Sequence, residues 1–405
     1  MRVPMLTHQI SRWGRGLAAL LLCFVSCLRA QTTNPQPTSL RKRAEIYSRL
    51  PLTKFYDTPS PLPPGKPGQL IRATPFDEYK LPVNVLATRI LYYSRAANGD
   101  LVASSGVVLY PGGKAPDGGW PVISWAHAIG GIARMCAPSL MRNLDGVPFL
   151  SMYANLGYAV VATDYAGLGT NFPNGFADAE SNAFNVIDSV AAARSAVKGV
   201  GSRWVAMGIG EGAMAAVRVA ELQHGNRGGN FLGSVAISQV ADLEDELGPT
   251  ASPAPDLPLL LAHGIKALNP HFKPEEILSA EAMPLYEKEG EECGVAGTGK
   301  AAAAGMLAPK WQSNKFLQEY LSRNRLGELP ADAPLLIVSG EEGARLVATM
   351  KAIRRMCSEG DHLFFQRYPE GNPAGVIGDS VRDQMAWIQD RFANRPARTN
   401  CSSQR

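Results

Sequence analysis

A short apolar run followed by a glycine-rich turn lies at residues 204–213, which read WVAMGIGEGA. The apolar half predicts a buried strand, and the residues after the glycines have the periodicity of a helix. Strand, turn and helix in this order are typical of a nucleophile elbow, G-x-S-x-G, in which small residues flank a serine on a strained turn. Gly208 and Gly212 hold the flanking positions of this elbow, and its central position is Gly210.

Apolar runs of strand length alternate with helical stretches on both sides of the elbow. The predicted strands are Ala87–Tyr93, Leu101–Tyr110, Trp120–Trp125, Gly157–Thr163, Trp204–Met207, Ser234–Ile237, Ala333–Ser339 and Leu363–Tyr368, and the clearest helices are Ala183–Val197, Ala213–Leu222, Arg345–Cys357 and Ser380–Phe392. Asn98-Gly99 between the first two strands is a strong hairpin signal. This alternation predicts an α/β fold with a mostly parallel central sheet and helices on both faces.

The alternation is interrupted once, over residues 242–330. This segment is rich in proline, charged residues and irregular helices, and it contains no predicted strand. A helical insertion late in an α/β sheet commonly forms a cap over the carboxyl ends of the strands. We therefore predict a core of residues 81–241 and 331–405, a helical cap inserted before the last strands, and an extended amino-terminal arm at residues 31–80.

The first 30 residues have the features of a signal peptide. Arg2, Arg12 and Arg15 precede the apolar run Leu17–Val25, and the small residue Ala30 follows. The run is too short for a transmembrane helix, which needs about 20 apolar residues, and no later segment qualifies. The sequence thus predicts an exported protein, either secreted or periplasmic.

The charge balance depends on this amino-terminal segment. The full chain has a formal charge of +4, and residues 1–30 contain four arginines and no acidic residue, so the remaining chain is formally neutral. A nucleic-acid-binding protein would carry a basic stripe on its mature domain, and the sequence has none. We therefore expect no nucleic-acid partner.

Six cysteines divide between the predicted signal peptide and the rest of the chain. Two lie in the signal peptide, and anchoring through a lipid on one of them, Cys27, is a minor alternative. The other four are Cys136, Cys293, Cys357 and Cys401. An even number in an oxidising compartment favours two disulfides over free thiols, although four cysteines allow three pairings.

Five further phrases carry a resemblance to a known family. They are Gly65–Gly68 (GKPG), Pro121–His127 (PVISWAH), Cys136–Ser139 (CAPS), Ala162–Thr170 (ATDYAGLGT) and Tyr368-Pro369. Together with the elbow, they make the chain resemble the secretory lipase family of α/β hydrolases over nearly all of the mature sequence. The resemblance implies the α/β-hydrolase fold, a Ser–acid–His triad and an acyl-binding tunnel under the cap. It also implies that Cys136 pairs with Cys293, and Cys357 with Cys401.

The chain departs from this family at every catalytic position. The family's serine falls on Gly210, its acid on Gly343 and its histidine on Pro373, and its His-Gly pair in the oxyanion loop becomes His127-Ala128. Ester hydrolysis by this fold needs an oxygen nucleophile, a base and an orienting carboxylate. Glycine and proline supply none of these. We therefore predict a pseudohydrolase that retains the fold and still binds an acyl lipid, another small apolar ligand or a protein partner.

An active lipase or esterase with a non-standard set of residues is the main alternative. Glu211 follows the centre of the elbow directly, and Glu342 adjoins the acid position. The sequence offers no replacement base, however. His127 is expected to make a structural hydrogen bond in its loop, His362 to begin a strand, and His224, His263 and His271 to be surface or packing residues. Asp164 is expected to stabilise the turn after its strand, without a catalytic role.

A nucleotide-binding enzyme is a further alternative, because residues 208–213 also fit the pattern G-x-G-x-x-A. That motif opens the first βαβ unit and requires an acidic residue about 20 positions later, at the end of the next strand. The elbow lies in the middle of the chain, and the next strand ends at Ile237-Ser238-Gln239 without an acid. We therefore expect neither a cofactor nor a metal site.

Overall fold

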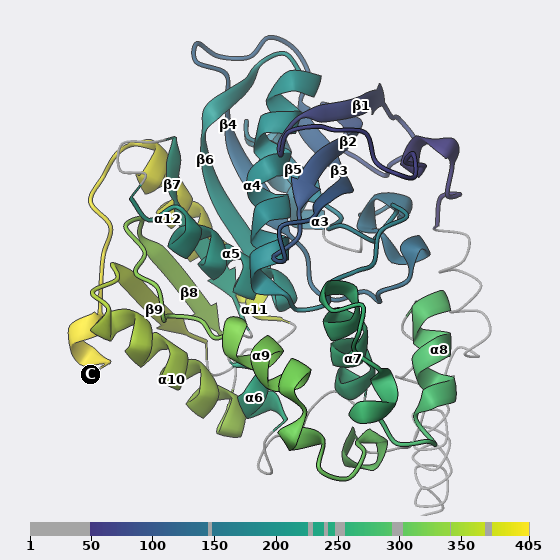
Figure 1. Cartoon of the computed structure of the whole chain (residues 1–405). Coiled ribbons are helices and arrows are strands. Elements are labelled where there is room, and N and C mark those ends of the chain that lie inside the picture. Colours follow the sequence, from purple (N-terminus) through teal and green to yellow (C-terminus); the bar gives the residue numbers. More distant parts are fainter. Residues whose placement is uncertain are drawn as a thin grey trace, which may run out of the picture. The chain divides into compact units, whose positions relative to one another are not determined.

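A nine-stranded sheet forms the centre of the computed structural model (Figure 1). The structure describes residues 49–144, 148–225, 230–238, 242–247, 256–293, 303–340, 342–368 and 375–404. The order of strands across the sheet is β1-β2-β3-β5-β4-β6-β7-β8-β9. Their bounds are β1 Leu70–Pro75, β2 Val85–Arg95, β3 Leu101–Pro111, β4 Trp120–Ala126, β5 Ala159–Thr163, β6 Val200–Ile209, β7 Phe231–Ile237, β8 Leu335–Ser339 and β9 Leu363–Arg367. The predicted signal peptide, residues 1–30, lies outside the described residues.

The first three strands are antiparallel, and β3 also pairs antiparallel with β5. The predicted hairpin is confirmed, because β2 and β3 are joined through Asn98-Gly99 and Gly99 has a φ of 89°, which favours glycine. The sequence patterning did not predict β1, which falls in the segment expected to be an arm. β1 is an edge strand of partly and fully exposed residues, so it lacks the apolar run by which inner strands are recognised.

The strands from β5 through β4, β6, β7 and β8 to β9 are parallel to their neighbours. Both β5 and β8 are buried along their whole length, which requires cover on both faces of the sheet. One face is covered by α4 (Ala179–Ala196), α5 (Glu211–Leu222) and α10 (Gly343–Ser358), and the other by α3 (Pro148–Asn155), α11 (Val376–Asp379) and α12 (Val381–Phe392). This arrangement confirms the predicted fold class.

The four predicted helices are present, although their ends differ from the expected positions. α4 begins at Ala179, four residues earlier than its apolar periodicity indicates, because Asp178 caps it and accepts a hydrogen bond from the Ser181 N–H at 2.7 Å. Such first turns are polar and carry little periodic signal. The short helix α3 was not predicted.

The described residues between β7 and β8, in the segment predicted to be a cap, are mostly helical, and we refer to them as the cap. Its helices are α6 (Leu243–Glu246), α7 (Leu257–Leu268), α8 (Met283–Glu291) and α9 (Lys315–Arg323), and Figure 1 shows them gathered at the end of the sheet where α5 begins. Their apolar side chains share one buried cluster with α5 and α10. Arg323 also lies 2.8 Å from the buried carboxylate of Asp178, which joins α9 to the start of α4.

Two disulfides are present in the described part of the chain, Cys136–Cys293 and Cys357–Cys401. These are the pairings implied by the family resemblance. The first joins the loop after β4 to the end of α8 in the cap, and the second joins α10 to the carboxyl-terminal tail. The cap and the tail are therefore covalently attached to the core.

Candidate functional site

The turn between β6 and α5 keeps the shape of a nucleophile elbow. β6 ends at Ile209, Gly210 follows with φ 59° and ψ −121°, and Glu211 begins α5. The Gly210 N–H donates to the Ile237 carbonyl oxygen at 3.1 Å, so β7 anchors the turn. This backbone conformation is strained for a residue with a Cβ atom and is readily adopted by glycine. The elbow therefore persists without the side-chain oxygen that a serine would place there.

The flanking glycines are explained by the close approach of α5 to two strands. A Cβ atom on Gly208 would lie 2.0 Å from the Gly212 carbonyl oxygen, and one on Gly212 would lie 2.1 Å from the Ala126 carbonyl oxygen. Both obstacles are backbone atoms of packed elements, which yield less readily than a flexible side chain. The G-x-G-x-x-A pattern thus has a packing explanation that does not involve a dinucleotide.

His127 lies directly after β4, at the start of the loop predicted to be the oxyanion loop. Its ring is buried and stacks on Tyr165, with ring centroids 4.3 Å apart. Nδ1 lies 2.6 Å from the Ala128 carbonyl oxygen, and Nε2 lies 3.2 Å from the Asp164 carbonyl oxygen. Both ring nitrogens therefore face backbone oxygens of the loops, which is the geometry of a structural histidine.

The Asp164 carboxylate is buried beneath the same loops. It accepts hydrogen bonds from the Ser105 hydroxyl at 2.6 Å, the Ser139 N–H at 2.8 Å and the Ser139 hydroxyl at 2.5 Å. Burial raises the pKa of this carboxyl group, and these hydrogen bonds oppose the rise by stabilising its ionised form. The bonds connect β3 and the turn after β5 to the loop that follows Cys136, so Asp164 holds these segments together.

The two residues predicted to occupy the acid and base positions, Gly343 and Pro373, come after β8 and β9 in the sequence. Gly343 begins α10 with a φ of 58°, is exposed, and has no surrounding atom within 4 Å of the place where a Cβ would lie. The neighbouring carboxylate of Glu342 is exposed and lies 3.8 Å from the Arg367 guanidinium, in a surface ion pair. Pro373 lies outside the described residues. Open space therefore surrounds the residue at the predicted acid position.

The described histidines form no Ser–His pair. His263 stacks on Tyr286 with ring centroids 3.8 Å apart, and its Nε2 lies 2.9 Å from the Tyr286 carbonyl oxygen. Burial lowers the pKa of His263 to about 4, so its ring is neutral near pH 7. His224 lies 3.2 Å from Asp332, and His362 faces a backbone carbonyl. Within the described ranges there is also no cluster of three side chains suited to hold a metal ion.

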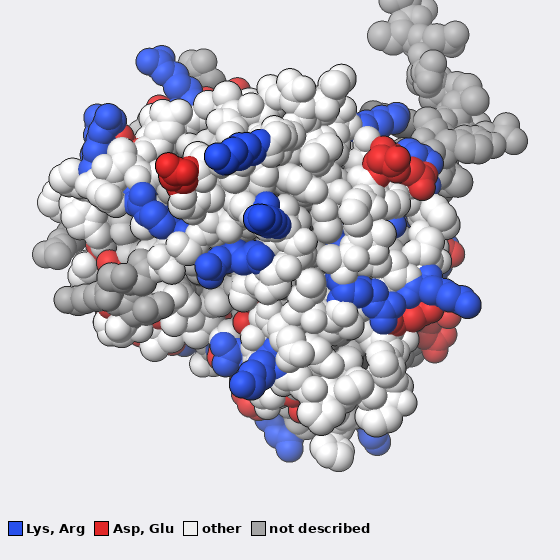
Figure 2. Space-filling view, turned by 90° about the horizontal axis from the view of Figure 1, so that it is seen from above, with Lys and Arg blue, Asp and Glu red and all other residues white. Residues whose placement is uncertain are grey.

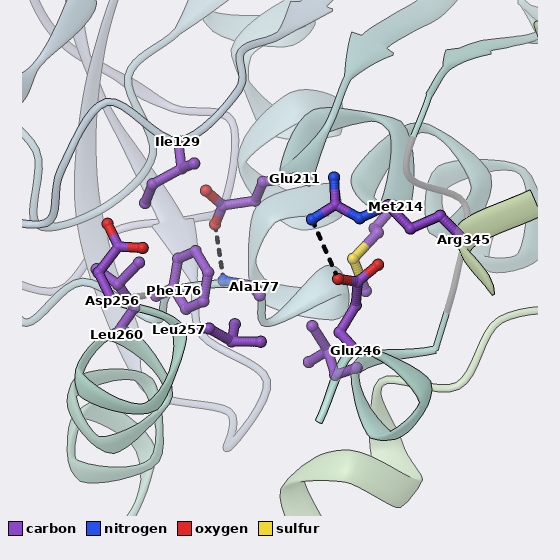
Figure 3. Close-up of a pocket in the computed structure, with 11 residues that line it drawn as sticks. Ile129, Phe176, Ala177, Glu211, Met214, Glu246, Asp256, Leu257, Leu260 and Arg345 are labelled. Carbon is purple, nitrogen blue, oxygen red and sulfur yellow. Dashed lines mark hydrogen bonds and ion pairs between the residues drawn. The ribbon is translucent and has the colours of Figure 1, made fainter. Parts of the chain in front are cut away.

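A cavity of about 100 Å³ opens beside the elbow, and we refer to it as the elbow cavity. It is lined by Ile129, Phe176, Ala177, Glu211, Met214, Leu243, Glu246, Asp256, Leu257, Leu260 and Arg345. Figure 3 shows these side chains converging from the oxyanion loop, the start of α5, the cap and α10. Most of the lining is apolar, as in small-molecule sites generally. The sequence gives no signal that these residues share one site, because they lie in separate segments that only the fold brings together.

Glu211 is a deeply buried charged residue of the elbow cavity, with 7% of its surface exposed. Its Oε1 accepts hydrogen bonds from the Ala177 N–H at 2.7 Å and from the Asn182 side-chain amide at 2.9 Å. No described residue donates a hydrogen bond to Oε2. Burial raises the pKa of the Glu211 carboxyl group, while the hydrogen bonds and nearby His127 lower it. The cavity is thus lined by a carboxyl group that adjoins Gly210 and has one oxygen without a hydrogen bond from the described residues.

Two features of the structure bear on nucleic-acid binding and on membrane insertion. On the face shown in Figure 2, basic side chains are scattered, with uncharged surface between most of them and acidic groups beside some. That face carries no continuous basic stripe of the kind that follows a nucleic-acid backbone. Of the helices in the described ranges, none has both the length and the apolar character needed to cross a bilayer.

Comparisons with known proteins agree with this architecture. A family model described as Secretory lipase matches residues 147–400. Candida antarctica lipase A in its closed state is similar with a TM-score of 0.72 and 16% identity, over 87% of this chain and 90% of that one. The rice cell wall degrading esterase LipA from Xanthomonas oryzae is similar with a TM-score of 0.65 and 18% identity, over 81% of this chain and 98% of that one. At these identities the two structures establish the fold alone. No curated protein matches the sequence significantly.

Proposed function

This chain belongs to the secretory lipase family, and we propose that it is an exported pseudohydrolase that binds a small apolar ligand, such as an acyl chain, in the elbow cavity. The observation that carries the proposal is Gly210. The elbow, its flanking glycines and an adjoining apolar cavity are all retained, while the nucleophile position has no side chain. Gly343 and Pro373 at the other triad positions support the same conclusion.

The chemistry of acyl transfer makes this loss severe. Without a nucleophile and base, oxyanion donors and binding alone leave an acceleration of only about 10³–10⁴-fold over water. The Glu211 side chain does not replace the missing base, because its Oε1 is engaged by two donors and no serine or histidine side chain hydrogen-bonds to it in the described structure. Loss of hydrolysis leaves the apolar walls of the cavity intact, so ligand binding is the activity that remains.

Hydrolysis of p-nitrophenyl acetate and butyrate by the purified, disulfide-bonded chain tests the loss of catalysis. We expect no turnover above buffer, and turnover at roughly 1 s⁻¹ or faster would contradict the proposal. Restoring the triad with Gly210→Ser, Gly343→Asp and Pro373→His is expected to give weak esterase activity. Gly210→Ser alone is the matched control, and it should stay inactive because it lacks a base.

An active esterase with an unrecognised set of residues is the competing function, favoured only by the Glu211 carboxyl group beside the elbow. It predicts that a fluorophosphonate labels one serine of the wild-type chain. We expect no labelling of wild type and labelling at position 210 in the triple variant. The nucleotide-binding alternative predicts a rise in Tm with NAD, which we do not expect.

Ligand binding and export need separate measurements. Mass spectrometry of the protein released from its native envelope or medium is expected to detect a bound apolar molecule that denaturation releases. The same spectrum gives the amino terminus, which we expect near residue 31 after removal of the signal peptide. A terminus at Cys27 with the added mass of acyl chains would instead establish the lipoprotein alternative.

A further inference from the structure

The charges around the elbow cavity are unevenly distributed. Glu246 lies 3.5 Å from Arg345, so these two charges offset each other on one side of the cavity. Glu211 and Asp256 also line the cavity, and neither forms an ion pair with a described residue. Figure 3 shows both of their carboxylates on the same side of the Arg345–Glu246 pair. This part of the cavity therefore has an excess of negative charge.

The Glu211 carboxylate lacks one donor. Oε1 is satisfied by the Ala177 N–H and the Asn182 amide, whereas Oε2 receives no hydrogen bond from the described residues. Glu211 lines the cavity. Burial disfavours the ionised form and raises the pKa of this group, and its hydrogen bonds and nearby His127 oppose this rise. A donor supplied by a ligand would satisfy Oε2, and a positively charged donor would also stabilise the ionised carboxylate.

The remaining walls fit the apolar part of such a ligand. Phe176 lines the same cavity as the two carboxylates, and an aromatic face adds attraction for an organic cation (Figure 3). Met214, Leu257 and Leu260 provide aliphatic surface. The cavity of about 100 Å³ is smaller than a cavity of roughly 150 Å³ that holds benzene, so it encloses about four or five non-hydrogen atoms.

We propose that the elbow cavity selects an amphiphilic amine: its ammonium group binds Glu211 Oε2 and Asp256, and its first carbons contact the apolar walls. The rest of a longer chain leaves through the opening of the cavity. This inference rests on the proposed ligand-binding function and specifies the chemistry of its ligand. The side chain of Glu211 then determines specificity. In catalytic α/β hydrolases, the residue at this position contributes its backbone N–H to the oxyanion hole.

Three probes with the same six-carbon chain separate charge from apolar binding: hexylamine, 1-hexanol and hexanoate. Their dissociation constants for the full exported chain are measured by ligand-observed NMR at neutral pH. We expect hexylamine to bind about tenfold or more tightly than 1-hexanol, since a charge-assisted hydrogen bond exceeds a neutral one. Hexanoate is expected to bind most weakly, because its carboxylate meets two others.

Substitutions test the assigned residue. Glu211→Gln keeps an oxygen that accepts from Ala177 and Asn182, and it should remove the preference for hexylamine while leaving 1-hexanol binding within about twofold. Asp256→Asn should weaken hexylamine binding by a smaller factor, and it tests the site even where Glu211→Gln fails to fold. Glu319→Gln, an exposed residue of α9 outside the cavity, is the matched control and should change nothing.

The possible outcomes distinguish the two proposals. Equal binding of the three probes, tightest binding of hexanoate, or an unchanged amine preference in both folded variants would overturn the amine inference and leave apolar binding standing. Failure of all three probes to bind would overturn the ligand-binding proposal itself. A preference for hexylamine that disappears in Glu211→Gln and survives in Glu319→Gln supports both.

Discussion

Alanine substitutions at two elbow glycines distinguish the two reasons for glycine at these positions. At Gly212 the obstacle is space, because a new Cβ would lie 2.1 Å from the Ala126 carbonyl oxygen, about 1.3 Å closer than the 3.4 Å at which ordinary contact begins. At Gly210 the obstacle is backbone conformation, with φ 59° and ψ −121°. We predict that Gly212→Ala destabilises the protein more than Gly210→Ala does.

The magnitudes follow from these geometries. Overpacking costs typically 1–3 kcal/mol, and we expect about 3 kcal/mol or more for Gly212→Ala because the contacted atom belongs to the backbone of a central strand. A residue with a Cβ in an unfavourable backbone region costs about 1–3 kcal/mol, and we expect Gly210→Ala in the lower half of that range. Unfolding entropy is about 2 cal/mol/K per residue, so for a chain of this length 1 kcal/mol corresponds to roughly 1–2 °C in Tm.

The assay is thermal unfolding followed by circular dichroism at one scan rate, supported by urea titration. Gly378→Ala is the matched control, because no atom lies within 4 Å of the added Cβ in α11. Alanine also lowers the conformational entropy of the unfolded chain, which favours the folded state. We expect Tm to fall most for Gly212→Ala, less for Gly210→Ala and not at all for Gly378→Ala. A Gly212→Ala variant that melts with wild type, or above Gly210→Ala, would refute the packing explanation of the elbow.

Three further predictions concern stability. Burial raises the pKa of Asp188 to about 6, so ionising this carboxylate costs the folded state stability as pH rises toward neutrality. The free energy of unfolding of Asp188→Asn should therefore gain on the order of 3 kcal/mol relative to wild type as pH rises from about 4 to 7. Urea unfolding across pH measures this difference, and a difference independent of pH would contradict the prediction. Replacing Cys357 and Cys401 together by serine removes a crosslink across 44 residues and should cost about 4 kcal/mol, seen as a lower urea midpoint. Arg323→Met leaves the buried Asp178 carboxylate without its cation and should cost about 3–5 kcal/mol, and a cost below about 1 kcal/mol would show that this pair does not hold the cap.

Much of the fold was predictable because its signals are local. The inner strands are continuous apolar runs, and the helices between them have regular periodicity, so their order and type can be recognised without tertiary information. The edge strand β1 escaped prediction because its half-exposed residues lack such a run. The disulfide pairing was implied by family resemblance, whereas the cysteines themselves allowed three connectivities.

The candidate site was predictable only in part. Gly210 and its flanking glycines stand out in the sequence, and Glu211 adjoins them. Asp256 and Arg345 carry no signal in the sequence, because a single aspartate before a cap helix and an arginine near the start of α10 are common surface residues. Their presence in one cavity depends on the packing of the cap against α5 and α10.

The sequence by itself determined that glycine at positions 210 and 343 offers no side-chain oxygen and that proline at 373 offers no base, and the proposed loss of hydrolysis rests on these residues. Only the tertiary structure decided the environment of the Glu211 carboxyl group beside the elbow. Burial, hydrogen bonding and the distance to a counter-ion determine how a carboxyl group behaves, and these depend on segments far apart in the chain. For this reason Glu211 acquires its two hydrogen bonds only when the loop after β5 and α4 pack against α5. It borders an apolar cavity only because the cap and α10 pack there as well.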